Sequence, residues 1–284
     1  AKAVVLASGG GGHLFANTTN PAQACGEGLS LAWRAGADIE DLEFVQFHPT
    51  ALKLAGAPCF LISEALRGEG ARLIDSHGAS PVAQLFGADL APRDQVSRAL
   101  VQAMQKQGID HIDLTLKAIP QTQLKARFPT ILQRCQDLGL DPLNQSIPIA
   151  PAAHYWMGGV ATNLEGATTL PGLYAVGECN FSDHGANRLG ANSLLQASID
   201  GYFILPNTIN NYLAGALEED IPTTDHIEFE KAEKEVRVII DRVLNINGTK
   251  TVDHFHRELG KVMWQECAMS RNKKGLEKAI LQIK

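Results

Sequence analysis

An apolar run that ends in four consecutive glycines constrains the fold more than any other feature of the sequence. Residues 3–7 are apolar, and Gly9–Gly12 follow after Ser8. An apolar strand that stops at a glycine turn is typical of a buried parallel strand in an α/β sheet. A second such run, Leu173–Val176, ends at Gly177. Glycine lets backbone amides approach a large cofactor closely. A glycine turn after a strand can equally be only a turn.

A mixed segment interrupts this α/β pattern. Apolar spacing predicts a helix over residues 28–35 and a strand over 42–47, whereas residues 50–150 combine short strands with helices. One of these helices, over 95–105, is expected to begin at an Asp94 N-cap. An insertion that splits an α/β domain places a crevice between two bodies. Such crevices, at the carboxyl ends of parallel strands, are where ligands bind.

The last third of the chain is predicted to be mainly helical. A helix is expected from Asn192 onward, and the acidic stretch Glu218–Asp225 is expected to be a linker. Beyond the linker, apolar residues recur at helical spacing over 229–243, 255–263 and 276–280. These three segments predict a helical module.

Composition excludes several classes of partner. The net charge of −6 argues against nucleic acid, which is bound by concentrated lysine and arginine. No apolar run approaches the roughly 20 residues that span a bilayer, and no signal peptide is visible, so we expect a cytoplasmic protein without direct membrane insertion. The cysteines are scattered and form no CxxC pair, which argues against a disulfide framework and an internal zinc or iron–sulfur site. His254 and His256 alternate on a predicted helix and should point to different faces, and His13 falls in a polar loop. We therefore predict no metal site.

Polar groups that bind carboxylates gather in five stretches of the sequence. These are Gln46–Thr50, Ser63–Gly70, Pro92–Asp94, His154–Gly159 and His184–Arg188. Arginine offers a rigid fork for carboxylates and histidine a tunable donor, so together they suit a substrate with two carboxylates. Glu64 and Arg67, at i and i+3, can share a helix face and pass a proton to a third group. Ordinary solvated charges and satisfied histidines fit the same spacing equally well.

The order of these stretches resembles the flavoprotein family of L-aspartate oxidase, succinate dehydrogenase and fumarate reductase. The matching segments are ASGG, TTNP, QFHPT, SEALRGEGA, APRD, PAAHYWMGG, GLYAVGE and HGANRLGANSLL. The resemblance covers nearly the whole chain. The first two-thirds is most similar to L-aspartate oxidase, and the last third is more similar to the succinate dehydrogenase flavoprotein.

The resemblance implies a partial α/β FAD-binding domain, interrupted by an α+β capping domain and followed by a C-terminal helical module. The FAD-binding domain would comprise residues 1–47 and 154–215. The capping domain would comprise residues 48–153, and a partial helical domain residues 216–284.

The resemblance also implies a role for each candidate site residue. Arg93 matches the general acid/base arginine, and Glu64 and Arg67 match its proton relay. The substrate carboxylates would be held by His48, Ser63, His154 and Arg188. The FAD would be contacted by Ala7, Ser8, Gly9, Gly10, Asn20, Glu27, Glu178, Asn192, Ser193 and Leu194. In such enzymes a hydride passes from a substrate carbon to the flavin.

The sequence departs from the family pattern in several places. The family's N-terminal GxGxxG unit does not occur, which leaves FAD retention by this chain alone in question. Glu27 replaces the usual Asp of a TGDG-like turn, and Ser63 replaces a usual Thr. The leading hypothesis is oxidation of L-aspartate to iminoaspartate. The second is a succinate dehydrogenase or fumarate reductase flavoprotein subunit, which would need an iron–sulfur partner. The third is an inactive fragment that retains the fold.

Overall fold

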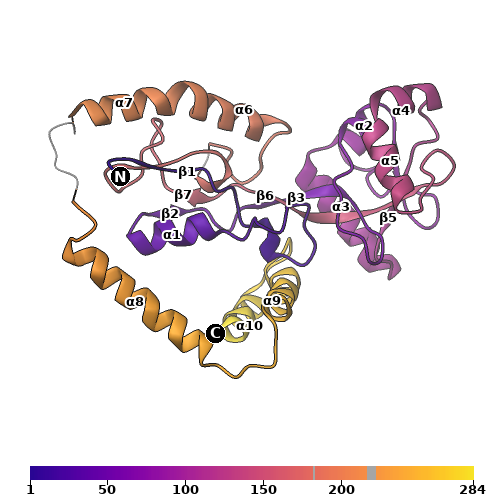
Figure 1. The fold of residues 1–284 in the computed structure, drawn as a ribbon. Helices are drawn as coiled ribbons and strands as arrows, with labels where there is room; N and C mark the ends of the chain where they lie inside the picture. Colours follow the sequence, from indigo (N-terminus) through magenta and orange to yellow (C-terminus); the bar gives the residue numbers. More distant parts are fainter. Residues whose placement is uncertain (182, 216–221) are drawn as a thin grey trace.

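The structure is a computed structural model that describes residues 1–181, 183–215 and 222–284. Figure 1 shows two bodies joined by the long strands β3 and β6, with helices from the C-terminal part of the chain along the first body. Among the described residues, no helix is both long and apolar enough to cross a membrane.

The first body contains two small sheets. Strand β1 (Val4–Leu6) pairs in parallel with β8 (Leu173–Ala175), and β2 (Ile39–Glu40) pairs antiparallel with β7 (Gly159–Val160). Helix α1 (Glu27–Ala35) packs on this side, as Figure 1 shows. The prediction of two parallel strands, each followed by a glycine turn, is therefore confirmed.

The expected burial of the first strand is wrong. The side chains of Val4 and Val5 are 47% and 41% exposed, and only Leu6 packs against the small core that α1 contributes. The parallel sheet has two strands among the described residues. The two small core clusters beside this sheet include Ala3 and Leu6 but neither Val4 nor Val5, whose side chains are therefore left exposed.

The second body is an α+β unit around a four-stranded antiparallel sheet with strand order β3-β6-β5-β4. The strands are β3 (Val45–Leu52), β4 (Arg72–Ile74), β5 (Ile112–Thr115) and β6 (Ile147–Trp156). The helices are α2 (Ala65–Gly68), α3 (Arg93–Gln107), α4 (Gln121–Arg127) and α5 (Pro129–Asp137). Its core is built from Leu and Ile side chains that are almost fully buried, including Leu52, Ile62, Leu66, Leu73, Leu100, Ile112, Leu114, Ile147 and Ile149. Each such side chain stabilises the fold by about 1.5–3 kcal/mol through burial.

Strand β3 lies further along the chain than the predicted strand over residues 42–47. It runs through His48, Pro49 and Thr50, so the segment QFHPT lies inside the strand and not after it. The pairing with β6 shifts in register between His48 and Ala51. Proline has no N–H to give to a sheet, and such an irregularity is where a strand tolerates it.

The predicted Asp94 N-cap is also wrong. Helix α3 begins at Arg93, and Pro92 is its N-cap residue, without a side-chain cap. Asp94 lies in the first turn and forms an ion pair with Arg98 one turn later. An acidic residue in the first turn still interacts favourably with the helix dipole.

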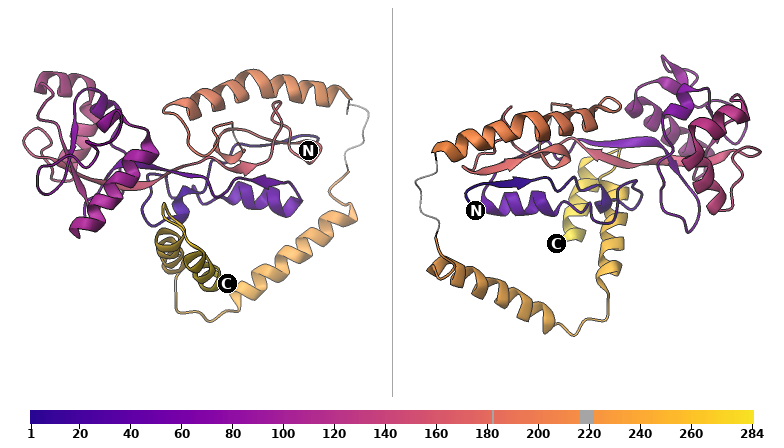
Figure 2. Two further views of the ribbon diagram at one scale, coloured as in Figure 1. Left: turned by 180° about the vertical axis from the view of Figure 1, so that it is seen from behind. Right: turned by 45° about the horizontal axis from the view of Figure 1, so that its top comes forward.

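The C-terminal part is helical, as predicted. Helix α6 (Asn192–Ile199), the π-helical turn η4 (Asp200–Ile204) and α7 (Leu205–Gly215) form one long rod over the first body. The three helices beyond it are α8 (Ile227–Leu244), α9 (Val252–Glu266) and α10 (Lys273–Ile283). The first four residues of the predicted linker, 218–221, lie outside the described residues. Both views in Figure 2 show α8 standing apart from the two bodies, while α9 and α10 return to the first.

Candidate active site

Strands β3 and β6 bring two of the predicted substrate-binding histidines together. The rings of His48 and His154 meet edge to face, with centroids 5.1 Å apart. Burial lowers the pKa of His48 well below its usual value, and His154 and Arg93 lower it further. Burial, with Arg93 and Arg188, lowers the pKa of His154 to about 4. Both imidazoles are therefore neutral at pH 7 and can each donate one hydrogen bond.

Arg93, Glu64 and Arg67 form a continuous chain of charges. The Nε of Arg93 donates to Glu64 Oε2 at 2.8 Å, and its Nη2 lies 2.7 Å from the same oxygen. On the other side, Nη2 of Arg67 lies 3.5 Å from Glu64 Oε1. The Arg67 guanidinium is buried and also donates to the backbone carbonyl of Asp89. The structure thus brings together the three residues predicted to act as acid/base and relay.

Gln46 joins this chain to Arg188, and sequence reasoning gave Gln46 no role. Its Oε1 accepts hydrogen bonds from Arg93 Nη1 at 3.1 Å and from Arg188 Nη2 at 3.0 Å. Its Nε2 donates to the Arg188 carbonyl at 2.6 Å. These hydrogen bonds fix the two guanidinium groups relative to each other, and Gln46 itself is buried, with 3% of its surface exposed. Its place at the start of QFHPT was the one signal in the sequence.

Arg188 lies on the face of Tyr155, with the guanidinium carbon 4.2 Å from the ring centroid. Burial, followed by the neighbouring Arg93, lowers the pKa of Arg188. Its Nε is buried without a hydrogen-bond partner. A buried donor of this kind needs an explanation, and an anionic ligand would supply one.

Ser63 lies at the start of the α2 segment, and its hydroxyl accepts a hydrogen bond from the Ala65 amide at 3.3 Å. No described contact joins Ser63 to the two histidines. Its role in holding a substrate carboxylate stays a prediction.

The glycine turn after β1 forms a tight cradle. Gly9 has a φ of +72°, and the space beside it is open, since a Cβ at that position would have no neighbouring atom within 4 Å. A Cβ on Gly10 would lie 2.4 Å from Glu178 Oε1, and one on Gly28 would lie 1.9 Å from Ser8 Oγ. The turn therefore packs directly on Glu178 and α1, at the carboxyl ends of the two parallel strands. This is where α/β folds hold large cofactors.

Glu178 lies in the turn after β8, next to the glycine turn. Its Oε1 accepts a hydrogen bond from the Trp156 amide at 2.9 Å. Burial raises the pKa of Glu178 to about 7, against the opposing effects of this hydrogen bond and of Arg188. The carboxyl group is therefore partly protonated near neutral pH and can both accept and donate a hydrogen bond.

The remaining predicted cofactor residues differ in their distance along the chain from the glycine turn and in their exposure. Asn20 donates to the His154 carbonyl at 3.0 Å, which links the segment after the glycine turn to the histidine pair. Asn192, Ser193 and Leu194 form the first turn of α6, where Leu194 is 73% exposed. Glu27 is exposed at the start of α1. Ala7 directly follows β1.

A cavity of about 910 Å³ lies between residues 16–21 and 52–61. Thr19 and Asn20 line it, and the Thr19 hydroxyl is 2.8 Å from His154 Nδ1. Its volume is in the range of cofactor and ligand sites. The histidine pair thus lies beside a space that can hold a ligand.

The FAD binding domain family matches residues 1–194, and the chain belongs to this family. The class of protein defined by the fold and the cradle is therefore a flavoprotein, with FAD as its cofactor. The glycine cradle, Glu178 and the open side of Gly9 fit such a group.

Comparison with individual proteins narrows this class. The chain is 43% identical to the L-aspartate oxidase of Nostoc sp. strain PCC 7120, over 100% of this chain and 48% of the relative. It is 50% identical to that of Bacillus subtilis, over 71% of this chain and 38% of the relative. The fold matches an E. coli quinol fumarate reductase FrdA mutant with a TM-score of 0.87 and 30% identity, over 99% of this chain and 50% of that one. It matches Mycobacterium smegmatis Sdh1 in the apo form with a TM-score of 0.77 and 29% identity, over 99% and 46%.

The resemblance inferred from the motifs is thereby confirmed. The chain spans about half the length of the relatives that it matches. The boundaries predicted for the capping and helical domains stay predictions.

Proposed function

We propose that the protein containing this chain oxidises L-aspartate to iminoaspartate, with FAD accepting the electrons. The observation that supports this most is the chain Arg67–Glu64–Arg93 beside two neutral histidines and Arg188. The relatives of high identity named above, both L-aspartate oxidases, favour aspartate as the substrate.

The charges of the cluster suit a dicarboxylate. Glu64 forms ion pairs with Arg67 and Arg93, while Asp89 acts on Arg67 and the partly protonated Glu178 acts on Arg188. The histidines are neutral. The cluster therefore carries a net positive charge in a largely buried setting. Charged hydrogen bonds in such a setting are stronger than in water, and arginine pairs with carboxylates in bidentate fashion.

Different residues of the cluster are placed for different steps of the oxidation. FAD, when bound, supplies the acceptor for a hydride. His48, His154 and Arg188 are placed to hold the substrate carboxylates. Arg93 is placed to exchange the remaining proton, since it contacts Glu64, which in turn contacts Arg67. An arginine needs such a neighbouring carboxylate and a water-poor site to exchange protons.

A second candidate is a succinate dehydrogenase or fumarate reductase flavoprotein subunit. The structural similarity to quinol fumarate reductase, with a TM-score of 0.87, favours it. That function would require an iron–sulfur partner subunit. A dicarboxylate site suits both reactions. The two candidates differ in their substrate, because aspartate carries an amino group and succinate does not.

The test is the visible absorption spectrum of the chain after incubation with FAD and removal of free FAD. A retained flavin band that bleaches anaerobically with L-aspartate, and not with succinate, is expected. Bleaching by succinate alone would favour the second candidate. A chain that retains no flavin would support the inactive-fragment hypothesis for this chain by itself.

A further inference from the structure

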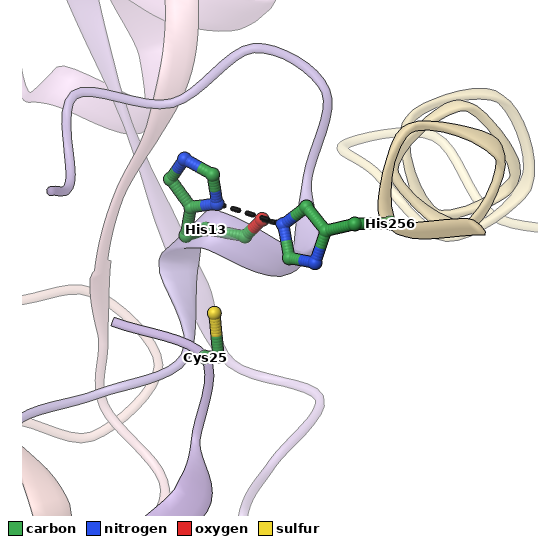
Figure 3. A group of neighbouring side chains, drawn as sticks. All are labelled: His13, Cys25 and His256. Carbon is green, nitrogen blue, oxygen red and sulfur yellow. Dashed lines mark hydrogen bonds between the residues drawn. The ribbon is translucent and has the colours of Figure 1, made fainter. Parts of the chain in front are cut away.

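We infer that His13, Cys25 and His256 form a zinc-binding site that ties helix α9 to the glycine turn. The possible ligand atoms of these three side chains all lie within 4.8 Å of one another. Figure 3 shows the sulfur of Cys25 pointing toward the two imidazole rings. The proposed site differs from the expectation of no metal, and it does not depend on the substrate of the enzyme.

The three side chains come from distant parts of the sequence. His13 lies in the short 3-10 helix η1 (Gly12–Leu14) after the glycine turn, Cys25 lies just before α1, and His256 lies in α9. The Nδ1 of His13 is 2.8 Å from the Nε2 of His256, and the two rings are stacked with centroids 4.9 Å apart. These nitrogens, with the Cys25 sulfur, are the ligands of the proposed site.

Separate backbone contacts hold the ligands in place. The His13 amide donates to the Ala24 carbonyl at 2.9 Å, which keeps His13 next to Cys25. On the other side, the Ala16 amide donates to the Gly260 carbonyl at 3.0 Å. A Cβ on Gly260 would lie 3.2 Å from the Ala16 nitrogen, so α9 packs closely against the loop here. The site is therefore built on fixed backbone, which metal binding requires.

The ligand chemistry selects zinc over the hard cations. A thiolate and two imidazoles suit Zn²⁺, whereas Mg²⁺ and Ca²⁺ prefer oxygen ligands. With Zn–N bonds of about 2.0–2.1 Å in a tetrahedral site, the two nitrogens need to separate by only about half an ångström. Water completes the fourth position, as in three-ligand zinc sites.

Binding changes the protonation of the ligands. The Nε2 of His256 lies 3.1 Å from the His13 carbonyl as well as near His13 Nδ1, which places a hydrogen on Nε2 without metal. On binding, that hydrogen is replaced by the metal and Nδ1 of His256 becomes the protonated nitrogen. The thiol of Cys25 releases its proton to solvent, so one proton leaves per zinc bound.

The neighbouring His254 is excluded from the site. It pairs with Glu258 at 3.1 Å on the same helix. This fits the expectation that His254 and His256 point to different faces. His254 is therefore a matched control for His256.

The experiment titrates the purified chain with Co²⁺ as a spectroscopic probe and then with Zn²⁺ in competition. We expect one metal ion per chain and a thiolate-to-cobalt charge-transfer band that is lost in Cys25→Ser. His13→Ala and His256→Ala should weaken zinc binding by at least about 10- to 100-fold, while His254→Ala and Cys59→Ser should not change it. A wild-type chain without the band, or a band that persists in Cys25→Ser, would overturn the site.

A second measurement needs no variant. Zinc should slow alkylation of Cys25 by iodoacetamide in the wild-type chain, measured peptide by peptide, and should leave alkylation of Cys59 unchanged. Equal alkylation of Cys25 with and without zinc would overturn the inference, and would show that His13 and His256 form a hydrogen bond only.

Discussion

Arg93 owes its position to groups from three segments of the chain. Glu64 binds its Nε and Nη2, Gln46 binds its Nη1, and a Cβ on Gly190 would lie 3.4 Å from its Nη2. A guanidinium held at several nitrogens has a fixed orientation. The proposed proton exchange depends on that orientation, and not on positive charge alone.

Replacing Arg93 by Lys should therefore separate chemistry from binding. We expect turnover to fall by at least about 100-fold. Dicarboxylate affinity should change by less than about tenfold, because a positive charge remains. Steady-state kinetics and a dicarboxylate titration would measure the two. Arg98→Lys, an exposed arginine on the same helix, is the control. Unchanged turnover in Arg93→Lys would remove Arg93 as the acid/base group.

Glu178 should make the stability of the FAD-free chain depend on pH. Burial raises its pKa to about 7, whereas glutamate in an unfolded chain titrates near about 4.3. The folded state therefore binds this proton more tightly. Its contribution to stability is complete below the unfolded value and is lost as the pH rises through about 7.

The variant Glu178→Gln tests this contribution. Between pH 5 and 7 the free energy of unfolding of the wild type should fall relative to the variant by about 2 kcal/mol. The buried His154, with a pKa of about 4, acts in the opposite direction but equally in both proteins. Urea unfolding at several pH values measures the difference, with the exposed Glu165→Gln as control. Parallel curves for wild type and Glu178→Gln would contradict the prediction.

At the level of secondary structure, the short link between β6 and β7 is closely packed against neighbouring backbone. A Cβ on Gly158 would lie 2.1 Å from the Asp41 carbonyl oxygen. One on Gly159 would lie 2.5 Å from the Cys179 carbonyl oxygen and 2.6 Å from the Asn180 carbonyl carbon. Both glycines are surrounded by backbone, which cannot move aside as a side chain can. Packing therefore requires glycine at both positions.

Gly159→Ala should destabilise the chain by about 1–3 kcal/mol or more, because the added methyl group forces the β7 backbone away from residues 179 and 180. Chemical denaturation measures the loss. Gly68→Ala is the matched control, since a Cβ there meets open space in helix α2 and should be neutral or stabilising. Equal stability of the two variants would show that the backbone around Gly159 has room for a methyl group.

At the scale of the whole molecule, the α+β body and the long helix α8 differ in how much of their apolar surface is buried. The α+β body buries a continuous set of aliphatic side chains. None of the residues of α8 is buried, although Phe229, Val236, Ile239 and Ile240 form an apolar face. Helix α8 therefore adds little to the stability of the described chain.

Substitutions in the two regions should differ accordingly. Ile240→Lys on α8 should change the free energy of unfolding by less than about 0.5 kcal/mol. Leu114→Ala, in the fully buried core of the α+β body, should cost about 2–5 kcal/mol. Thermal or urea unfolding of both variants measures the contrast. A large loss in Ile240→Lys would mean that α8 packs against the rest of the chain in solution.

Local sequence patterns alone predict many of the secondary-structure elements of this protein. The two apolar strands and their glycine turns, the helices of the C-terminal part, and the contact between Glu64 and Arg67 follow from short-range periodicity and spacing. The parallel pairing of β1 with β8 does not, because it joins distant residues. The ordered motifs from ASGG to HGANRLGANSLL were sufficient to identify the family. These features are predictable because each depends on residues that are neighbours along the chain.

The rest depends on packing between distant segments. Gln46 contacts Arg188, and His13 contacts His256, across separations of 142 and 243 positions. The exposure of Val4 and the run of β3 through His48 depend likewise on which elements cover or pair with them. Periodicity in one sequence tells which face of an element is apolar, but not which other element meets that face or in what register. The site geometry therefore emerges only when the chain is folded.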